Sequence, residues 1–315
     1  MGSGYEEIDL GKVRTSPVSE RDSKVTVDMM GSPVKGGKAF RKWLDSLPDQ
    51  LAVSRLKKLT LAMRRARSGK GRELIWMSGA HVIKCGLSPY LADLMRKGYL
   101  TALALNGAGI IHDLELAFFG KTSEDVSSQL ERGDFGFAEE TAALLFEAVD
   151  RGAEEGLGLG EAVGRFIVSS DAPHRDVSIT ARAAIEKVPV TVHVAIGTDI
   201  VVQHPGFDGS LWGELSARDF RIFAARVQAL GENGGVIVNA GSAVILPEVF
   251  LKALSVARNL GAGFEGITAC NLDMTAHYRP SENVLSRPSA FGGEAISLTG
   301  HHEIMIPLIY SALLS

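Results

Sequence analysis

Hydrophobic residues along this chain follow two patterns, short unbroken apolar runs and longer stretches in which they return at helical spacing. Residues 103–105 form such a run, and apolar side chains then recur at Ile110, Leu114 and Phe118. A short run is typical of a buried strand, and a period near 3.6 residues indicates a helix. The Asn-Gly-Ala-Gly segment 106–109 separates them. We therefore predict a strand, a turn and a helix, with turn amides that can face an anion. A plain βα turn, with glycine for backbone shape alone, is the alternative.

The same alternation covers most of the remaining chain. Strands are predicted at residues 73–77, 188–196, 235–238, 264–270 and 294–298, with a candidate edge strand within 197–214. Helices are predicted as two segments within 39–67, then from Ser88, at 137–149, 161–168, 220–230 and 247–259, and from Glu303 to the end. Strands that alternate with helices imply an α/β fold, with a mostly parallel sheet and helices on both faces.

The first 37 residues differ from the rest, because they mix glycine, serine, proline and charged residues without sustained periodicity. This composition predicts a flexible N-terminal arm. No linker-like segment interrupts the later alternation. We therefore predict that residues 38–315 form a single α/β domain.

Composition narrows the class of protein. The chain has 315 residues, of which 45% are hydrophobic and 22% charged, so it can bury a full core. Its net charge of −4 argues against nucleic acid as a partner. It has neither the roughly 18 consecutive apolar residues of a membrane span nor an apolar signal core at its N-terminus, so we expect a cytoplasmic protein without a membrane partner. Cys85 and Cys270 lie in strand-like contexts without metal-type spacing.

Six short blocks appear in a recognisable order from about residue 72 to the end. They are SGAHVIKCG (78–86), NGAGIIHD (106–113), DGSLWGE (208–214), ITACNLD (267–273), RPSENV (279–284) and IMIPLIYSALL (304–314). In this order and spacing the chain resembles the deoxyhypusine synthase family. The corresponding blocks of that family read SNLVSSG, TAGGVEED, DGSLGD, NTAQEFD, RPDEAV and a closing VFPLL helix.

The resemblance implies a Rossmann-like fold that binds NAD, in a homotetramer built from dimers with sites between paired subunits. Enzymes of the family oxidise a polyamine with NAD, form an imine and pass an aminobutyl group to a lysine or a small amine. Such chemistry needs a nicotinamide, carboxylates for a cationic amine and usually a lysine to hold the imine. NAD and NADP are not distinguished at this level.

Several departures argue against deoxyhypusine synthesis itself. The family's imine-forming lysine follows its RPDEAV block, but here no lysine occurs after Lys252. Pro288 stands near that position with Arg287 beside it, and arginine stays protonated and cannot act as an amine nucleophile. The family's GGGVVKHH block appears as NAGSAVILP, without histidine or lysine.

The residues that do match predict a site. Glu214 and Glu282 are the carboxylates expected to hold the amine, and charge pairing would suit a cationic amine or guanidine. Cofactor contacts are expected from Asn106, Gly107, Ala108, Gly109, Asp208, Thr268, Ala269, Asp273 and His301. The alternative for each acid is a surface residue or a helix cap, and Asp208 in particular can serve only to shape its turn.

Two basic side chains complete the predicted catalytic set. Lys84 lies within an apolar segment, where an unpaired charge is costly, so it is either a relocated imine lysine, a partner for a ligand anion, or a lysine whose charged end reaches solvent. His112 is expected to move a proton or to contact a phosphate. The histidines at 112, 193, 204 and 301–302 offer a metal site as a further alternative, although no spacing among them is a metal signature.

The function predicted from these residues is NAD-dependent oxidation of a small cationic amine, a polyamine, guanidine or amino-acid-like compound, followed by transfer or deamination through an imine. Two other classes remain open. A metal-dependent hydrolase on the same sheet would contain bound metal, and a non-catalytic nucleotide-binding protein would account for the missing lysine. Ionisable residues crowded at the turns favour an enzyme.

Overall fold

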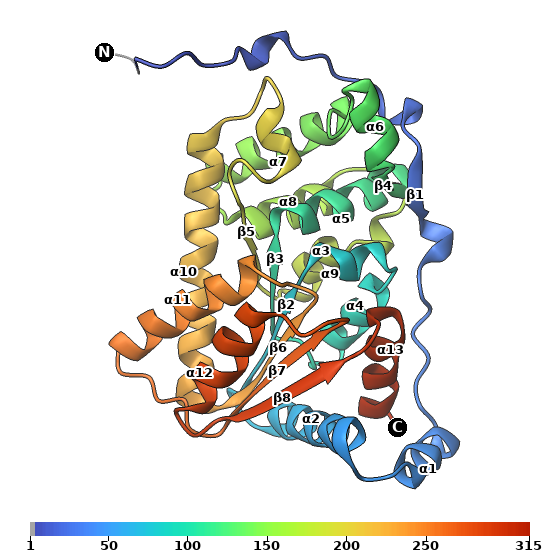
Figure 1. Ribbon diagram of the computed structural model, residues 1–315, viewed down its shortest axis with the longest axis vertical. Coiled ribbons are helices and arrows are strands. Elements are labelled where there is room, and N and C mark those ends of the chain that lie inside the picture. The colour runs from blue at the N-terminus through green and yellow to red at the C-terminus, as the bar shows by residue number, and fades with distance from the viewer. Residues whose placement is uncertain (1–3) are drawn as a thin grey trace.

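A six-stranded parallel sheet runs through the centre of the protein (Figure 1). The computed structural model describes residues 4–315. The sheet contains β2 (Glu73–Ser78), β3 (Ala102–Asn106), β5 (Val190–His193), β6 (Gly235–Ala240), β7 (Ile267–Asp273) and β8 (Glu294–Thr299). A separate antiparallel pair joins β1 (Ser23–Thr26) to β4 (Lys121–Glu124).

The strand order is that of a Rossmann sheet. Across the sheet it reads β5-β3-β2-β6-β7-β8, so the six strands, counted along the chain, lie in the order 3-2-1-4-5-6. The chain moves outward from β2 to β5, then returns to the other side of β2 with β6. The direction in which the chain adds strands therefore reverses between β2 and β6, at the topological switch point. Ligands of such sheets bind there, at the carboxyl ends of the strands. The predicted α/β, Rossmann-like fold class is confirmed.

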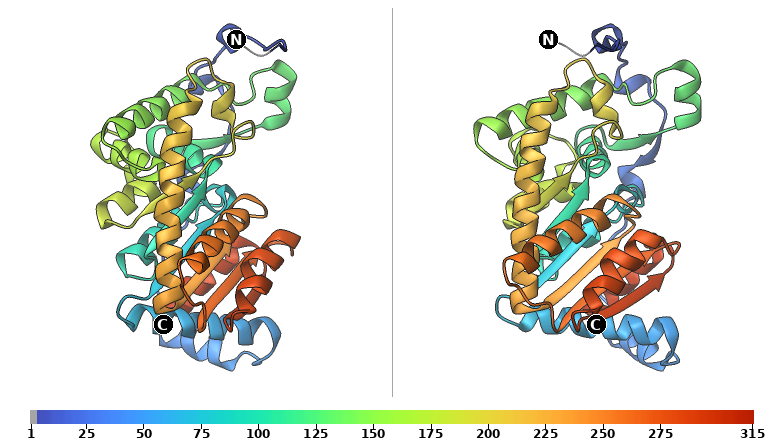
Figure 2. Two further views of the ribbon diagram at one scale, coloured as in Figure 1. Left: turned by 90° about the vertical axis from the view of Figure 1, so that its left-hand side faces the viewer. Right: turned by 60° about the vertical axis from the view of Figure 1, so that its left-hand side comes forward.

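Helices cover both faces of the sheet (Figures 1 and 2). They are α1 (Lys38–Ser46), α2 (Leu51–Ser68), α3 (Ala80–Lys84), α4 (Ser88–Arg96), α5 (Gly107–Phe119), α6 (Val126–Arg132), α7 (Glu139–Glu154), α8 (Leu159–Ser169), α9 (Ile179–Glu186), α10 (Gly209–Asn233), α11 (Ile245–Asn259), α12 (Arg287–Ser289) and α13 (His302–Leu313). A π-helical segment, Pro280–Ser286, precedes α12, and 3₁₀ turns lie at Leu10–Lys12, Val18–Glu20, Val27–Met29, Arg175–Val177 and Ile200–Gln203.

The two cores follow from the alternation of side chains along β2. Leu74 and Trp76 belong to the core that includes buried side chains of α2, α4 and α13. Ile75 and Met77 point to the opposite face and join the core formed with α10 and α11. Because successive side chains of a strand point to opposite faces, a strand between two helical layers is apolar throughout. This explains the unbroken apolar run seen in the sequence.

Strand β5 is shorter than predicted. Residues 188–196 were expected to be extended, but β5 ends at His193, opposite Asn106, the last residue of its neighbour β3. Beyond it, the amide of Val194 bonds to the Ser216 side chain of α10. The expected edge strand within 197–214 is also wrong, because Ile200–Gln203 forms a 3₁₀ turn.

Two further departures concern the turns. The segment after β2 folds into the short helix α3, so Cys85 ends a helix and does not lie in a strand. No strand was predicted over residues 121–124, yet Lys121–Glu124 is strand β4. Asp125 alone caps the following helix α6, by accepting a hydrogen bond from the Ser128 amide.

The N-terminal segment packs on the domain along part of its length. Strand β1 pairs with β4, and Val18 and Arg21 are buried. Residues 18–26 of the expected arm therefore have partners in the body of the protein, and the flexibility of the arm stays a prediction. Its first three residues lie outside the described part of the chain, and the boundary at residue 37 stays a prediction. Within residues 4–315, no helix has the length and apolarity needed to cross a bilayer.

Candidate functional site

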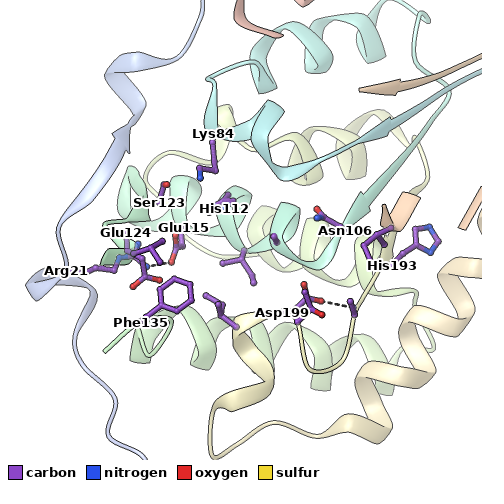
Figure 3. Close-up of a pocket in the computed structure, with 17 residues that line it drawn as sticks. Arg21, Lys84, Asn106, His112, Glu115, Ser123, Glu124, Phe135, His193 and Asp199 are labelled. Atoms are coloured by element: carbon purple, nitrogen blue, oxygen red, sulfur yellow. Dashed lines mark hydrogen bonds and ion pairs between the residues drawn. The ribbon is translucent and has the colours of Figure 1, made fainter. Parts of the chain in front are cut away.

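A cavity of about 270 Å³ opens beyond the carboxyl ends of β3 and β5 (Figure 3). Its polar and charged lining comes from five separate parts of the chain. These residues are Arg21, Lys84, Asn106, His112, Glu115, Ser123, Glu124, His193, Thr198 and Asp199. Drug-sized ligands occupy pockets of about 300–1,000 Å³, so this volume suits a molecule of amino-acid size.

The predicted glycine turn forms one wall of the cavity, and one of its amides bonds to a side chain of the turn itself. The Asn106 side chain caps α5 by accepting a hydrogen bond from the Gly109 amide at 3.2 Å. The Asp199 carboxylate lies against Gly107, where a Cβ would fall 2.1 Å from its Oδ2 atom. An acid at a helix N-terminus offsets the helix dipole. An anion at this turn would therefore meet the Asp199 carboxylate beside it, and the predicted cofactor contacts of the turn stay a prediction.

Lys84 reaches the cavity from the last turn of α3. Figure 3 shows its side chain directed toward Ser123 and His112. Its ammonium group has no hydrogen bond or ion pair with another residue of the described chain. A partly buried ammonium without a partner pays a desolvation cost that a ligand anion or a covalent bond to a substrate would relieve. Lys84 thus lies at the cavity, and its role stays a prediction.

A buried ion pair forms the opposite wall. Arg21 Nη1 donates to Glu115 Oε1 at 2.7 Å, and the two side chains are 5% and 1% exposed. Thr141 donates to the same oxygen at 2.8 Å, while Thr122 donates to Glu115 Oε2 at 2.5 Å. The carboxylate therefore accepts three hydrogen bonds, which offset its desolvation.

Strand β4 contributes three consecutive residues to this region, because Ser123 has a left-handed backbone with φ of 64°. Thr122 bonds to the ion pair, and both Ser123 and Glu124 line the cavity. A regular strand would alternate them between faces. Burial raises the pKa of the Glu124 carboxyl, although the Gly136 amide donates to it. Such strained backbone often accompanies function.

The two histidines of the cavity are neutral. Burial lowers the pKa of His112 to about 4, and the nearby Lys84 and Arg21 lower it further against the opposing effect of Glu115. Burial likewise lowers the pKa of His193 to about 3. A neutral imidazole can accept a proton at neutral pH.

The switch point lies beside the cavity, at the turns that follow β2 and β6. Gly79 and Gly241 pack so closely that a Cβ on Gly79 would fall 2.0 Å from the Gly241 carbonyl oxygen. Asn239 Oδ1 and His302 Nδ1 are buried here without a hydrogen-bond partner among the described residues. Unpartnered buried polar atoms are rare. His302 Nε2 lies 3.2 Å from the Leu272 carbonyl oxygen and therefore carries the ring proton, so His302 Nδ1 and Asn239 Oδ1 are both acceptors that hydrogen-bond donors of a ligand would satisfy. A nucleotide with ribose hydroxyls and a carboxamide fits this requirement.

The structure brings together only some of the predicted residues. Lys84, Asn106, Ala108 and His112 line the cavity, and Gly107 and Gly109 lie directly behind it in α5. Glu214 is exposed on α10 and pairs with Arg218 at 3.2 Å. Glu282 lies in the π-helical segment and is not among the residues that line the cavity. Neither predicted amine-holding carboxylate therefore reaches Lys84 and His112.

The remaining predicted cofactor contacts are also scattered. Asp208 caps α10 by accepting hydrogen bonds from the Ser210 and Leu211 amides, so the alternative of a turn-shaping role describes it. Asp273 ends β7 at the carboxyl edge of the sheet. Thr268 and Ala269 lie near the amino end of β7, and His301 is exposed at the start of α13.

Several cavity residues were not predicted. They include Arg21, Glu115, Glu124 and Asp199. The available signal was Glu115 itself, an acid within the apolar pattern of α5. Its partner Arg21 is 94 positions away, and no local pattern connects the two.

The histidines form no metal centre in the described structure. Across residues 4–315, no three His, Cys, Asp or Glu side chains group as metal ligands would. His112 faces the cavity, while His301 is 3.9 Å from Glu303 on the surface. His204 bonds to the Gly136 carbonyl and supports the loop after β5.

Comparisons with known proteins give a likeness of fold. No protein-family model matches the sequence, and no curated protein matches it. AgrE, solved with ornithine and NAD+, superposes with a TM-score of 0.53 at 14% identity, over 82% of this chain and 32% of AgrE. A conserved putative LOR/SDH protein from Methanococcus maripaludis S2 superposes with a TM-score of 0.52 at 15% identity, over 90% of this chain and 73% of that protein.

A putative deoxyhypusine synthase from Entamoeba histolytica superposes less well, with a TM-score of 0.49 at 11% identity, over 89% of this chain and 96% of that protein. The resemblance to the deoxyhypusine synthase family therefore stays a prediction from the sequence blocks. This chain spans about a third of the length of AgrE. Identities this low establish the shared fold and leave the activity to be argued from the site.

Proposed function

We propose that this protein is an enzyme that oxidises a small, amino-acid-like amine in the cavity, with a nicotinamide nucleotide bound at the switch point. The observation that carries the proposal is the unpartnered ammonium of Lys84, which shares a cavity of amino-acid size with a neutral histidine and buried carboxylates. Perturbed ionisable groups that converge in one cavity are characteristic of catalytic sites.

The charges of the cavity indicate the class of substrate. Arg21 and Glu115 neutralise each other through their ion pair. This leaves the cation of Lys84 and two carboxyl groups, Glu124 and Asp199, that form no ion pair within the described chain. A ligand with one carboxylate and one or two amino groups would complement them. Glu124 and Asp199 thus take the amine-holding role that the sequence suggested for Glu214 and Glu282.

The nucleotide is proposed to lie over Gly79 and Gly241, with Asn239 and His302 as polar contacts. A bound nicotinamide supplies a hydride acceptor, which makes the amine carbon electrophilic. Helix α3 begins at this turn and ends at Lys84, so it connects the switch point to the cavity. The neighbour AgrE was solved with ornithine and NAD+, ligands of the chemistry proposed here.

Four side chains then have defined tasks. Glu124 and Asp199 orient the amine, His112 accepts a proton, and Lys84 either attacks the electrophilic carbon through its amine or binds the substrate carboxylate. The predicted homotetramer and cytoplasmic location belong to the same proposal. A choice between NAD and NADP depends on the nucleotide that the protein retains.

Mass spectrometry of small molecules released from gently purified, heat-denatured protein tests the cofactor, with metal analysis on the same sample. We expect NAD or NADP. Substrates are tested with NAD+ or NADP+ by following the loss of ornithine, arginine, lysine, putrescine and spermidine by mass spectrometry, together with ammonia release. Net NADH is a poor readout, because a transfer or deamination that returns the hydride to the product regenerates NAD+ and leaves no NADH to detect. Metal without nucleotide would contradict the proposal and favour a hydrolase.

Lys84 is tested by substitution. Lys84→Ala should lower turnover at least about 100-fold, whereas Lys12→Ala, at a side chain that is 82% exposed, should leave it unchanged. Lys84→Arg keeps the charge but cannot act as an amine nucleophile. If Lys84→Arg restores the wild-type KM but not kcat, Lys84 acts as the nucleophile. If it restores both KM and kcat, Lys84 binds the substrate carboxylate through its charge. Full activity in Lys84→Ala would remove the residue from the site.

A further inference from the structure

We propose that Arg21, Glu115 and Thr122 hold His112 in the tautomer that carries its proton on Nδ1, so that Nε2 faces the cavity as a proton acceptor. The catalytic use of this nitrogen rests on the proposed function. The tautomer itself follows from a continuous chain of hydrogen bonds and can be measured independently of any reaction.

The direction of each bond decides the tautomer. Thr122 has one hydroxyl proton, which it donates to Glu115 Oε2 at 2.5 Å. The same hydroxyl oxygen lies 2.7 Å from His112 Nδ1. Because Thr122 donates its hydroxyl proton to Glu115, its oxygen can only accept in the contact with His112. His112 Nδ1 therefore carries a proton and donates it to the Thr122 oxygen. A neutral imidazole has only one N–H, so Nε2 carries a lone pair.

Arg21 sets the direction of the whole chain. Its guanidinium donates to Glu115 Oε1 and requires a carboxylate, not a carboxylic acid, as its partner. Without this cation, a buried Glu115 can take up a proton and donate it to Thr122. Thr122 would then donate to His112 Nδ1, and the ring proton would move to Nε2. Through this chain of bonds, Arg21 in the N-terminal segment controls the proton of His112 on α5.

The free nitrogen is available to a ligand. His112 lines the cavity, and its Nε2 has no hydrogen-bond partner among the described residues, nor is it among their buried unpartnered atoms. The low pKa of about 4 keeps the imidazole neutral at pH 7, with burial as the main cause. Because Lys84 reaches into the same space (Figure 3), its ammonium or a substrate ammonium can donate to this nitrogen.

The corresponding step is a simple proton transfer. An N–H bond forms at His112 Nε2 while the N–H bond of an ammonium breaks, and the electron pair of that bond stays on the amine nitrogen. The imidazolium keeps its Nδ1 bond to Thr122, and the Glu115 carboxylate beyond it stabilises the new charge. His112 would be the catalytic residue, and Arg21, Glu115 and Thr122 are positioning residues.

Long-range ¹H–¹⁵N correlation spectra of the ¹⁵N-labelled protein at pH 7.5 test the tautomer. The His112 ring signals are assigned by their loss in His112→Gln. We expect wild type to show a protonated Nδ1 and a bare Nε2. Thr122→Val and Arg21→Met should each shift the population toward a protonated Nε2, while Thr122→Ser, which keeps the hydroxyl, should retain the wild-type pattern. Arg21→Lys, which keeps the charge, should do the same.

Two outcomes would overturn the inference. One is a protonated Nε2 in wild type, and the other is an unchanged tautomer in folded Thr122→Val. If Arg21→Met does not fold, the two Thr122 variants still decide the question, because they keep the ion pair. Turnover separates this inference from the proposed function: a confirmed tautomer without amine turnover would leave the chain of bonds standing and reject the enzyme assignment.

Discussion

Arg21 and Glu115 form a buried ion pair of 2.7 Å between residues 94 positions apart. The pair attaches the N-terminal segment to helix α5, alongside the pairing of β1 with β4. A wall of the cavity therefore depends on a segment that the sequence pattern set apart from the domain. Among the described residues, Arg21 Nε and Nη2 are buried without a hydrogen-bond partner, and Glu115 is the carboxylate that pairs with this guanidinium.

Removal of one partner should destabilise the protein strongly. We expect Arg21→Met to lower the free energy of unfolding by about 3–5 kcal/mol, because it leaves a buried carboxylate without its cation. The matched control is Lys24→Met, in the same segment, where the ion pair with Asp125 is largely exposed. Its loss should cost less than about 1 kcal/mol. Urea denaturation of the two variants makes the comparison, and equal losses would contradict a buried, structural role for Arg21.

Asp219 should make stability depend on pH. Its carboxyl is buried on α10, where Oδ2 accepts hydrogen bonds from the Gly160 and Val192 amides, and burial raises its pKa to about 7. The folded protein then holds a proton that the unfolded chain, with an ordinary pKa of 3.8, releases. The resulting stabilisation is complete below pH 4 and is lost as the pH rises through 7.

Asp219→Asn measures this effect, because an amide keeps the acceptor oxygen but cannot titrate. Relative to wild type, the variant should gain up to about 1.4 kcal/mol of stability per pH unit between pH 5 and 7. Urea denaturation at pH 5, 6, 7 and 8 gives the difference. Asp150→Asn, at an exposed position, is the control and should show a flat difference. A flat difference for Asp219→Asn as well would show that the carboxyl is ionised across this range.

Gly107 should not accept a side chain. An alanine Cβ would fall 2.1 Å from Asp199 Oδ2, so Gly107→Ala must displace a buried carboxylate and should cost about 1–3 kcal/mol. Gly213→Ala is the control within a helix, because beyond the neighbouring residues and backbone of its own helix no described atom lies within 4 Å of its Cβ position. That change should stabilise the protein by about 0.5–1 kcal/mol. Thermal unfolding distinguishes opposite signs, and a neutral Gly107→Ala would argue against the Asp199 contact.

The two cysteines should react at different rates. Cys270 is fully buried in β7, and burial raises its pKa to about 12, whereas Cys85 is partly exposed. Only thiolates react with aromatic disulfide reagents, so the native protein at pH 8 should release about one equivalent of chromophore, and the denatured protein about two. Cys270→Ser should leave the native reaction unchanged. Equal reactivity of both thiols would indicate that β7 opens in the native state.

Much of the fold was predictable because its signals are local. The run at residues 103–105, the glycine turn and the helical spacing after it correspond to β3 and α5. Predictions failed where tertiary contacts decide the conformation. Strand β5 ends where its neighbour β3 ends, and strand β4 exists because β1 pairs with it.

The candidate site was predictable only in part, for the same reason. Lys84 and His112 were noticeable as polar residues within apolar segments, and both line the cavity. Glu214 was transferred from a resemblance, yet it lies on the exposed face of α10 beside Arg218. A short motif records residue types and order, but it does not record which way a helix turns its side chains.

The sequence by itself determined the alternation of strands and helices, because hydrophobic period, glycine turns and helix caps act over a few residues. Only the tertiary structure decided the order of the strands, the place of the cavity and the partner of Glu115. These depend on contacts between distant segments, such as that of Arg21 with α5. The proton on His112 belongs to this second group, since its position follows from a chain of bonds that begins in one segment and ends in another.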